Sequence, residues 1–336
     1  MKELLAKATK QTQAVSLDCS VTLSKADVVT KRIEFVGIKS SNAVFNCGGG
    51  TLKLSPIARP SLGYAIFISS EKVNDKWERP ENIRIRNCTI LGGIRIKGLG
   101  FNGEGKDVRA SSLKSGHTKR AQASAPTNIQ LDRVKINALG STAIYASPGV
   151  TKLQLRNSKI FGTSVSAAIY LDAESAHHVI TDNVISVANK RELIAVDGAA
   201  NVLIARNRFS NLETGGIYLY RNCGEGGTIR HQAPQRNQIV DNHFYYNKFK
   251  GRKLSAINFV KNLNFRIPAI WLGQRNGKRP YCSHDKGFAF GSSKSNASFA
   301  DNNLVKNNQI VKIKAKRMII DDGKNNRIIG NRTVKR

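Results

Sequence analysis

A short phrase recurs along the chain at nearly constant spacing: an apolar residue, a gap, then Asn or Ser, any residue, and Ile or Phe. Two clear copies are Ile85-Arg86-Asn87-Cys88-Thr89-Ile90 and Ile204-Ala205-Arg206-Asn207-Arg208-Phe209. The copies end at residues 90, 136, 160, 185, 209, 244, 310 and 333, so most gaps are 23–25 residues, one spans two repeats and two contain insertions. Self-similarity at a fixed period of this length is typical of a stacked-repeat architecture.

Each repeat alternates apolar and polar residues over short runs rich in Ile, Val and Leu, which is the periodicity of β-strands. The Leu-x-x-Leu-x-Leu ladder of leucine-rich repeats is absent, and the Asn-Gly hairpin dipeptide occurs only at Asn102-Gly103 and Asn276-Gly277, which disfavours a β-sandwich. Three short strands with their turns fill about 24 residues. We therefore predict an all-β, single-stranded, right-handed parallel β-helix, in which Asn residues occupy left-handed turns and bond from coil to coil.

A solenoid grows along one axis, so we expect a single domain over residues 1–336. A cap that includes a polar helix up to about Ala14 would cover the unpaired strand edges at the open end of the stack. The expected parts are an N-terminal cap (1–20), long loops (98–126 and 221–236), an insertion-rich region (245–302) and terminal coils (303–336).

No run of 18 apolar residues occurs, so we expect no membrane span. The first residues lack the apolar centre of a signal peptide. We expect a monomer that is secreted or periplasmic and has lost its signal, with a cytoplasmic location as the alternative.

Charge is the second strong feature of the sequence. The chain has 54 Lys and Arg against 23 Asp and Glu, a formal net charge of +31. Such a field attracts polyanions: acidic polysaccharides, nucleic acid, or lipopolysaccharide and anionic membrane surfaces. The alternative is a set of solvated Lys faces without a partner. No ribonucleoprotein signature is present, so we expect an acidic polysaccharide rather than nucleic acid.

The chain contains five cysteines. We predict disulfides between Cys19 and Cys47 and between Cys223 and Cys282, with Cys88 buried inside a coil; five buried free thiols are the alternative. No Cys-x-x-Cys or His-x-x-x-His spacing indicates zinc.

A second column of residues follows the same period. Its members are Ile144-Tyr145-Ala146-Ser147, Ile169-Tyr170-Leu171-Asp172, Ile194-Ala195-Val196-Asp197, Ile217-Tyr218-Leu219-Tyr220 and Ile270-Trp271-Leu272-Gly273. Residues two apart share one face of a strand, so the aliphatic residues point inward. The outward set is Tyr145, Tyr170, Tyr218 and Trp271, with Asp172, Asp197 and Tyr220. One face of the stack is therefore predicted to carry aromatic rings beside carboxylates.

That combination suits a carbohydrate, because aromatic faces stack on sugar rings. Asp172 and Asp197 on adjacent coils repel each other. Either one keeps a proton, which yields an acid and base pair for glycoside hydrolysis, or a cation is recruited, which yields a Ca²⁺ site with Glu174 as a third ligand. The alternative for both Asp residues is turn capping at a strand end.

Loops beside this face add functional groups. Arg221 and Arg230 would hold a carboxylated sugar, and Tyr220 or His231 would move protons. The predicted catalytic residues are Asp172, Asp197, Tyr220, Arg221 and His231. The predicted substrate-binding residues are Tyr145, Tyr170, Glu174, Arg191, Tyr218, Glu225, Arg230 and Trp271.

The chain resembles a bacterial family of right-handed parallel β-helix repeat proteins. The resemblance rests on Ala168-Ile169-Tyr170-Leu171-Asp172-Ala173-Glu174-Ser175-Ala176, Ile194-Ala195-Val196-Asp197-Gly198 and Gly216-Ile217-Tyr218-Leu219-Tyr220-Arg221-Asn222-Cys223-Gly224-Glu225-Gly226-Gly227, and extends over most of the chain. The wider superfamily that it resembles includes pectate lyases, polygalacturonases, chondroitinase-type lyases and mannuronan epimerases, which implies an acidic polysaccharide substrate. The Asp-Pro-His-Asp motif of the epimerases is absent, which puts epimerisation in doubt.

We expect a polysaccharide lyase acting on a uronate-containing glycan. Elimination needs a neutralised carboxylate, a base near the C5 proton and a donor for the leaving oxygen. The alternatives are a glycoside hydrolase that uses Asp172 and Asp197, and a surface protein that binds an acidic glycan without cleaving it.

Overall fold

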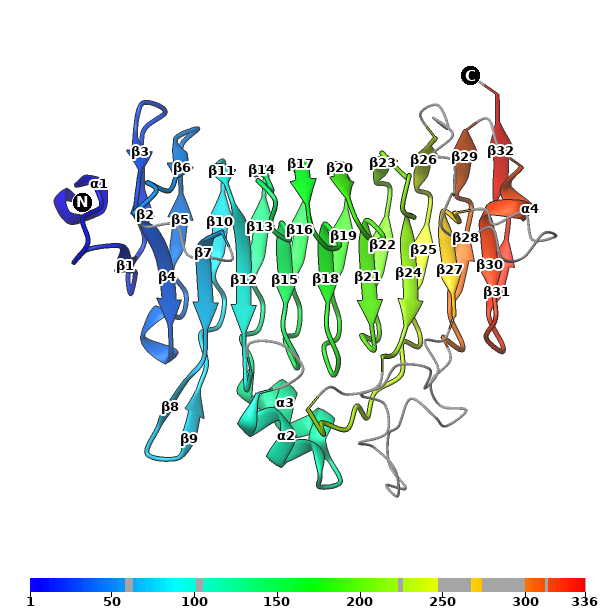
Figure 1. The fold of residues 1–336 in the computed structure, drawn as a ribbon, viewed down its shortest axis with the longest axis horizontal. Helices are drawn as coiled ribbons and strands as arrows, with labels where there is room; N and C mark the ends of the chain where they lie inside the picture. The colour runs from blue at the N-terminus through cyan, green and yellow to red at the C-terminus, as the bar shows by residue number, and fades with distance from the viewer. Residues whose placement is uncertain are drawn as a thin grey trace.

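The computed structural model describes residues 1–57, 63–100, 105–222, 226–246, 267–273, 300–311 and 314–335. These residues form three parallel sheets of ten strands each, which we call sheets A, B and C (Figure 1). Each coil contributes one strand to each sheet, in the order A, B, C. The prediction of an all-β parallel β-helix is confirmed.

The strand bounds show how short each rung is. Sheet A contains β1 (Ala14–Ser16), β4 (Arg32–Val36), β7 (Tyr64–Ser69), β12 (Gly93–Lys97), β15 (Ile144–Ala146), β18 (Ile169–Leu171), β21 (Ile194–Asp197), β24 (Ile217–Tyr220), β27 (Ile270–Leu272) and β30 (Ile319–Asp321). Sheet B contains β2 (Val21–Thr22), β5 (Val44–Asn46), β10 (Arg84–Arg86), β13 (Gln130–Asp132), β16 (Gln154–Arg156), β19 (Val179–Thr181), β22 (Leu203–Ala205), β25 (Gln238–Val240), β28 (Leu304–Lys306) and β31 (Arg327–Ile329). Sheet C contains β3 (Val28–Val29), β6 (Thr51–Lys53), β11 (Thr89–Leu91), β14 (Lys135–Asn137), β17 (Lys159–Ser164), β20 (Val184–Asn189), β23 (Arg208–Ser210), β26 (His243–Tyr245), β29 (Gln309–Val311) and β32 (Arg332–Val334).

The core is a stack of like side chains. In sheet A, Ile144 pairs with Ile169 and Ile169 with Ile194 in register, and all three are fully buried. In sheet C the rings of Phe209 and Phe244 stack with centroids 5.0 Å apart. Because every coil buries the same positions, alternation along each strand directs the polar residues to solvent.

The recurring phrase spans the end of a sheet B strand, a turn and the start of a sheet C strand. Asn183, Asn207, Asn242, Asn308 and Asn331 follow one another up the stack, and each Nδ2 donates to the Oδ1 of the next at 2.9–3.0 Å. Asn residues at the preceding turn position, such as Asn157 and Asn307, have positive φ. The predicted coil-to-coil bonding and left-handed turns are both confirmed.

The predicted pairing of Cys19 with Cys47 is wrong, because Cys47 forms a disulfide with Cys88. Cys47 and Cys88 lie after the sheet B strands of successive coils, with Cα atoms 4.8 Å apart. Cys19 lies before its sheet B strand, at the opposite end, and is exposed and free. Cys223 and Cys282 lie outside the described residues.

Helix α1 (Lys2–Leu5) stands at the N-terminal end of the stack and is shorter than the predicted cap helix. Its Leu4 is buried in the core, and the Lys31 ammonium donates to the Glu3 carbonyl oxygen at 2.7 Å. A short 3₁₀ helix η1 (Ile38–Ser40) follows β4, and helix α4 (Ala315–Met318) buries Met318 near the C-terminal end. Within the described ranges, no helix has the length and apolarity to cross a membrane.

The long insertions among the described residues gather at one edge of the molecule. All of them follow sheet A strands: the hairpin of β8 (Glu71–Val73) and β9 (Lys76–Glu78), helices α2 (Lys106–Ser112) and α3 (His117–Ser124), and residues 221–222 and 226–236. Figure 1 shows the hairpin and both helices beyond the lower ends of these strands. The turns between sheets B and C have only two residues in every coil from β10 to β32. Because binding residues concentrate on loops that a rigid scaffold positions, we expect the functional residues on the sheet A side of the molecule.

Candidate functional site

The outer face of sheet A carries the predicted row of aromatic residues. Tyr145, Tyr170, Ala195, Tyr218 and Trp271 pair in register on consecutive strands. The Tyr145 and Tyr170 rings stack with centroids 4.8 Å apart and planes 10° apart. Tyr218 and Trp271 meet edge to face at 5.5 Å. The predicted common face is confirmed.

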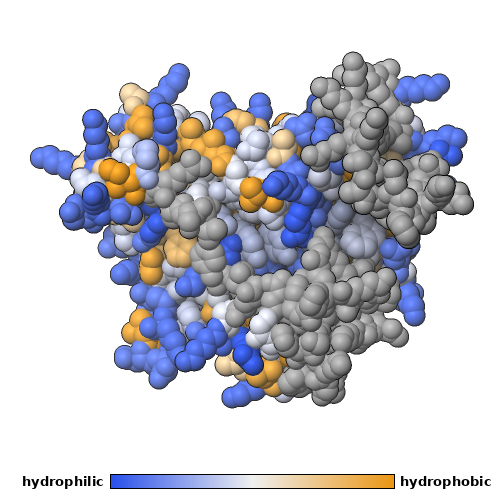
Figure 2. Space-filling view, viewed as in Figure 1, coloured by the Kyte–Doolittle hydropathy of each residue, from blue (hydrophilic) through white to orange (hydrophobic). Residues whose placement is uncertain are grey.

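Figure 2 looks onto this side of the molecule. The face is hollowed near its middle, and hydrophobic side chains gather along the rim above the hollow. Tyr145, Tyr218 and Trp271 are half-buried, whereas Tyr170 is buried. The half-buried rings therefore offer surface to a ligand, while Tyr170 supports them from within.

Arg95 extends the aromatic row by one coil, since it pairs with Tyr145 in register. Its guanidinium carbon lies 3.5 Å from the centroid of the Tyr145 ring, within the range of a cation–π contact. Ile94-Arg95-Ile96-Lys97 has the same apolar alternation as the second column of the sequence and precedes it by two repeats, which is the signal for this residue, but no site role was predicted for it.

The aromatic row is interrupted at Ala195, and polar residues gather above this small side chain. Tyr220 packs in one hydrophobic cluster with Ala195 and Tyr170. Its hydroxyl donates to Glu192 and accepts from Arg191, and Arg191 also pairs with Glu192 at 3.0 Å. We call Arg191, Glu192 and Tyr220 the Tyr220 cluster.

Arg191 is the accessible charge of the Tyr220 cluster. Its side chain is 30% exposed, against 2% for that of Glu192. Burial alone would lower the pKa of Arg191, but Tyr220 and Glu192 raise it above its ordinary value. Arg191 is therefore a permanent cation at the surface of the aromatic row.

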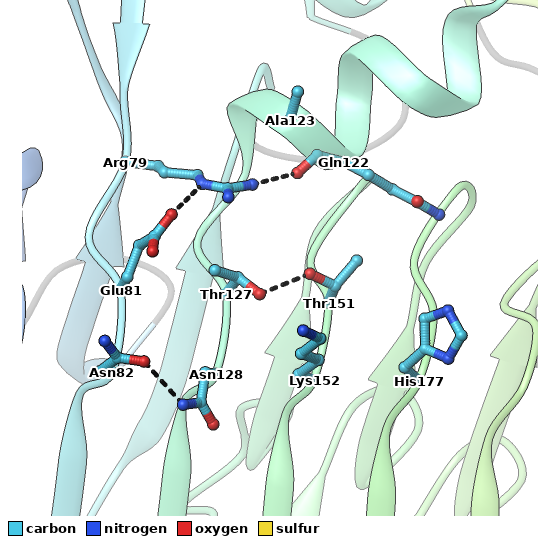
Figure 3. Close-up of a pocket in the computed structure, with 10 residues that line it drawn as sticks. All are labelled: Arg79, Glu81, Asn82, Gln122, Ala123, Thr127, Asn128, Thr151, Lys152 and His177. Atoms are coloured by element: carbon cyan, nitrogen blue, oxygen red, sulfur yellow. Dashed lines mark hydrogen bonds and ion pairs between the residues drawn. The ribbon is translucent and has the colours of Figure 1, made fainter.

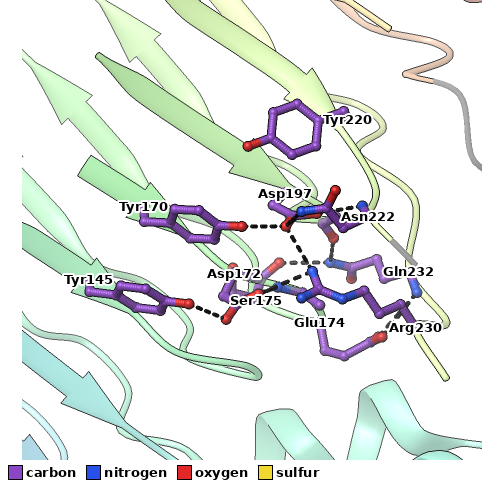
Figure 4. A network of polar contacts seen from close by, with 12 residues as sticks. Tyr145, Tyr170, Asp172, Glu174, Ser175, Asp197, Tyr220, Asn222, Arg230 and Gln232 are labelled. Carbon is purple, nitrogen blue, oxygen red and sulfur yellow. Dashed lines mark hydrogen bonds and ion pairs between the residues drawn. The ribbon is translucent and has the colours of Figure 1, made fainter. Parts of the chain in front are cut away.

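A second cluster lies at the C-terminal ends of the sheet A strands. Asp172 and Asp197 are fully buried there. The Tyr145 hydroxyl donates to Asp172 at 2.7 Å and the Tyr170 hydroxyl to Asp197 at 2.5 Å. One guanidinium nitrogen of Arg230 lies 3.2 Å from Asp172 and 2.9 Å from Asp197 (Figure 4). The cation between the two carboxylates thus comes from the chain itself.

We call Arg230, Asp172, Asp197, Tyr145 and Tyr170 the Arg230 cluster. Burial has the largest effect on the pKa of Asp172 and raises it. The charge of Asp197 raises this pKa further, whereas the charge of Arg230 lowers it. Burial would lower the pKa of Arg230, but the two carboxylates raise it well above its usual value. The pKa values of Tyr145 and Tyr170 are raised by burial and by the facing carboxylates, so both phenols stay protonated.

Residues 226–232, which we call the strap, hold Arg230 in place. Glu174 accepts the backbone N–H groups of His231 (2.6 Å) and Gln232, together with the Thr118 hydroxyl. The Gln232 side-chain amide donates to the carbonyl oxygens of Ser175 and Gly198 at 2.7 Å (Figure 4 shows Glu174, Ser175 and Gln232). The strap thereby closes the end of sheet A over the buried carboxylates.

Helices α2 and α3 support the strap from the other side. The His231 Nε2 lies 2.8 Å from the Ser112 carbonyl oxygen, and its ring meets that of His117 edge to face at 5.1 Å. Arg221, fully buried, donates to the carbonyl oxygens of Arg230 and His231. Arg221 and His231 thus hold the strap, and their predicted catalytic roles stay predictions.

The predicted calcium ligands do not assemble. Among the described residues, no three His, Cys, Asp or Glu side chains converge on one point. Glu174 binds the strap, and Arg230 occupies the position between Asp172 and Asp197. A calcium ion would have to displace this guanidinium, so the site does not fit the ion as it stands. Glu225 lies outside the described residues.

A separate open pocket of about 430 Å³ lies at the turns between sheets A and B, beneath α3 (Figure 3). Arg79 binds Glu81 at 2.7 Å and the Gln122 carbonyl oxygen at 2.6 Å, and the hydroxyls of Thr127 and Thr151 are bonded at 2.7 Å. These polar groups bond to one another, so we interpret the pocket as a consequence of the stacked turns between sheets A and B and not as a binding site.

The family model described as right-handed β-helix region matches residues 77–265. The chain belongs to this family. No curated protein matches this β-helix. The solved structures to which it is similar include the A-modules of the Azotobacter vinelandii mannuronan C-5 epimerases AlgE6 and AlgE4. The AlgE6 module is 10% identical (94% of this chain, 88% of that one, TM-score 0.22), and the AlgE4 module is 9% identical (96% and 88%, TM-score 0.23).

Proposed function

We propose that the protein binds an acidic polysaccharide across the outer face of sheet A and cleaves it by elimination at the Tyr220 cluster. The observation that supports this most directly is the accessible cation Arg191, whose guanidinium carbon lies 5.4 Å from the centroid of Tyr170 in the row of in-register aromatic rings. Tyr145, Tyr218 and Trp271 offer faces to sugar rings. The net charge of +31 attracts the polyanion to the molecule.

The Tyr220 cluster contains the groups that an elimination needs. A uronate carboxylate bound by Arg191 lies beside the Tyr220 hydroxyl, because Arg191 already donates to that oxygen. Neutralising the carboxylate makes the neighbouring C5 proton more acidic. Tyr220 takes this proton while it passes its own to Glu192. The C5–H electron pair then forms the C4=C5 double bond as the C4–O bond breaks. The leaving oxygen takes a proton from the Tyr220 hydroxyl, and Glu192 returns its proton to Tyr220.

The geometry supports hydrolysis by Asp172 and Asp197 less well. Both carboxylates are fully buried, accept tyrosine hydroxyls and share Arg230, whose side chain is only 6% exposed. Tyr220 is fully buried as well, but its partner Arg191 is 30% exposed and can bind a substrate carboxylate. An acid and base pair has to reach the glycosidic oxygen and a water molecule on opposite sides of the sugar. In our proposal these residues hold the end of sheet A together instead.

The test offers the protein polygalacturonate, alginate, chondroitin sulfate and hyaluronan, and follows ultraviolet absorbance from the new double bond. Tyr220→Phe, which keeps the ring, should reduce the rate at least about 100-fold. Arg191→Ala should do the same while weakening binding. The matched control is Tyr245→Phe, which removes a half-buried hydroxyl on sheet C and keeps the ring that faces Arg208.

An unchanged rate in Tyr220→Phe would refute the assigned base. Binding to one polymer without a double bond or shortened chains would replace the lyase by a non-catalytic glycan-binding function. No binding to any of the four would reject the proposal for this panel.

We also propose that the protein works outside the cytoplasm. The Cys47–Cys88 disulfide supports this, since such bonds persist in oxidising compartments.

A further inference from the structure

A second charged surface runs along the turns between sheets B and C, away from sheet A. We call it the basic edge, and it consists of Arg133, Lys135, Arg156, Lys159, Arg206 and Arg208. All six side chains belong to exposed residues. The two-residue turns hold successive coils in one phase, so Lys135, Lys159, Val184 and Arg208 follow one another in register along sheet C. Arg156 lies on the neighbouring sheet B, between Asp132 and Thr181.

The basic edge is poorly compensated by carboxylates. Asp132 binds Arg133 at 2.7 Å, and Asp182 binds Arg206 through two bonds of 2.8 Å. The other four cations form no ion pair with any residue in the part of the chain that the structure describes. Those four are Lys135, Arg156, Lys159 and Arg208.

Two of these cations are stacked directly. Lys135 of β14 pairs in register with Lys159 of β17, and neighbouring strands lie about 4.8 Å apart. Like charges directly opposite each other destabilise a sheet. An anion bound between them would remove that repulsion.

Aromatic rings accompany the cations on sheet C. The Lys159 ammonium lies 5.7 Å from the centroid of Phe161, and the Arg208 guanidinium lies 5.1 Å from that of Tyr245. The Tyr245 ring stacks on His243. Cations beside half-buried rings provide both contacts that an acidic sugar offers: a charge and an apolar ring face.

We propose that the basic edge is a second binding surface for an acidic polysaccharide, separate from the face of sheet A. Lys135, Lys159 and Arg208 lie in one row parallel to the solenoid axis, interrupted only by Val184, and such a row suits an extended polymer lying along the stack. The phosphates of a DNA duplex curve away from such a row, so few would be reached at once. This inference goes beyond the proposed reaction and stands whether or not sheet A cleaves the polymer.

The experiment compares two variants of equal net charge. Lys135→Glu/Arg156→Glu/Lys159→Glu changes the basic edge, and Lys10→Glu/Lys25→Glu/Lys39→Glu changes three exposed lysines elsewhere. Each lowers the formal charge by six, from +31 to +25. Affinity for long-chain polygalacturonate is measured at several salt concentrations. The basic-edge variant should bind at least about 10-fold more weakly with a shallower salt dependence, and the control within about 2-fold of the parent.

Equal losses in both variants would show a diffuse charge effect and overturn the inference, as would no loss in the basic-edge variant. Binding of duplex DNA more tightly than polygalacturonate, lost only in the basic-edge variant, would reassign the surface to nucleic acid.

Two further measurements separate this inference from the proposed reaction. The neutral variant Lys135→Gln/Arg156→Gln/Lys159→Gln should melt no lower than the parent, because it removes repulsion, and should still lose affinity. Its turnover of a short oligouronate should stay at the parent rate. If the neutral glutamine variant keeps full affinity for the long polymer, the inference is overturned, even if the glutamate variant fails to fold.

Discussion

Arg230 links Asp172 and Asp197 at the end of sheet A, and all three side chains are almost fully buried. Removing one partner of a buried ion pair leaves an uncompensated charge. We predict that Arg230→Met destabilises the protein by about 3–5 kcal/mol, measured by urea unfolding.

The matched control is Arg206→Met, which breaks the surface pair with Asp182. Its cost should stay at or below about 1 kcal/mol, since exposed pairs contribute little. A triple variant that also carries Asp172→Asn and Asp197→Asn should recover part of the loss. Equal costs for the two arginine variants would contradict the structural role of Arg230.

His178 is fully buried, and burial, with a smaller effect of His177, lowers its pKa to about 3. Its Nδ1 accepts the backbone N–H of Leu153 at 3.2 Å. Because the unfolded chain binds a proton at higher pH than the native state, stability falls as pH drops below about 6.5. At pH 5 this cost is about 2 kcal/mol.

His178→Asn should remove this acid sensitivity and keep the turn bond, as Asn237 does for the N–H of Val202. Melting temperatures from pH 7 to pH 5 test it, with exposed His177→Asn as the control. His117, whose pKa burial lowers to about 4, should account for a remaining slope. The same slope in His178→Asn and the parent would refute the assignment.

At the scale of elements, the Cys47–Cys88 disulfide joins turns that follow two adjacent sheet B strands and closes a loop with a sequence separation of 41. Loop closure of this length contributes roughly 3–4 kcal/mol through the unfolded state. We predict that Cys88→Ser lowers the free energy of unfolding by about this amount, and that a reductant has no further effect on that variant.

The control is Cys19→Ser, because Cys19 is exposed and free. It should leave stability and its response to reductant unchanged. A thiol count that fell when Cys88 was replaced, with no effect of Cys88→Ser on stability, would contradict the pairing.

At the scale of the whole molecule, a net charge of +31 repels itself in the compact state. Raising NaCl from about 0.01 M to about 1 M shortens the screening length from roughly 30 Å to 3 Å. We predict that the melting temperature rises by several degrees over this range, whereas the buried Arg230 cluster is little screened. A falling melting temperature would mean that attractive surface pairs outweigh the repulsion.

The repeat in the sequence was enough to predict the parallel coils, the inward Ile and Leu columns, the Asn bonds and the common face of Tyr145, Tyr170 and Tyr218, because these depend only on period and alternation. Period and alternation could not predict which cysteines pair, nor which cation lies between Asp172 and Asp197. Cys88 meets Cys47 because an insertion between them leaves their coils adjacent in the stack. Arg230 reaches Asp172 from 58 positions away along the chain because the strap folds back onto the stack. Local periodicity determines which way a side chain points, whereas the path of the strap, set by tertiary contacts, determines what it meets.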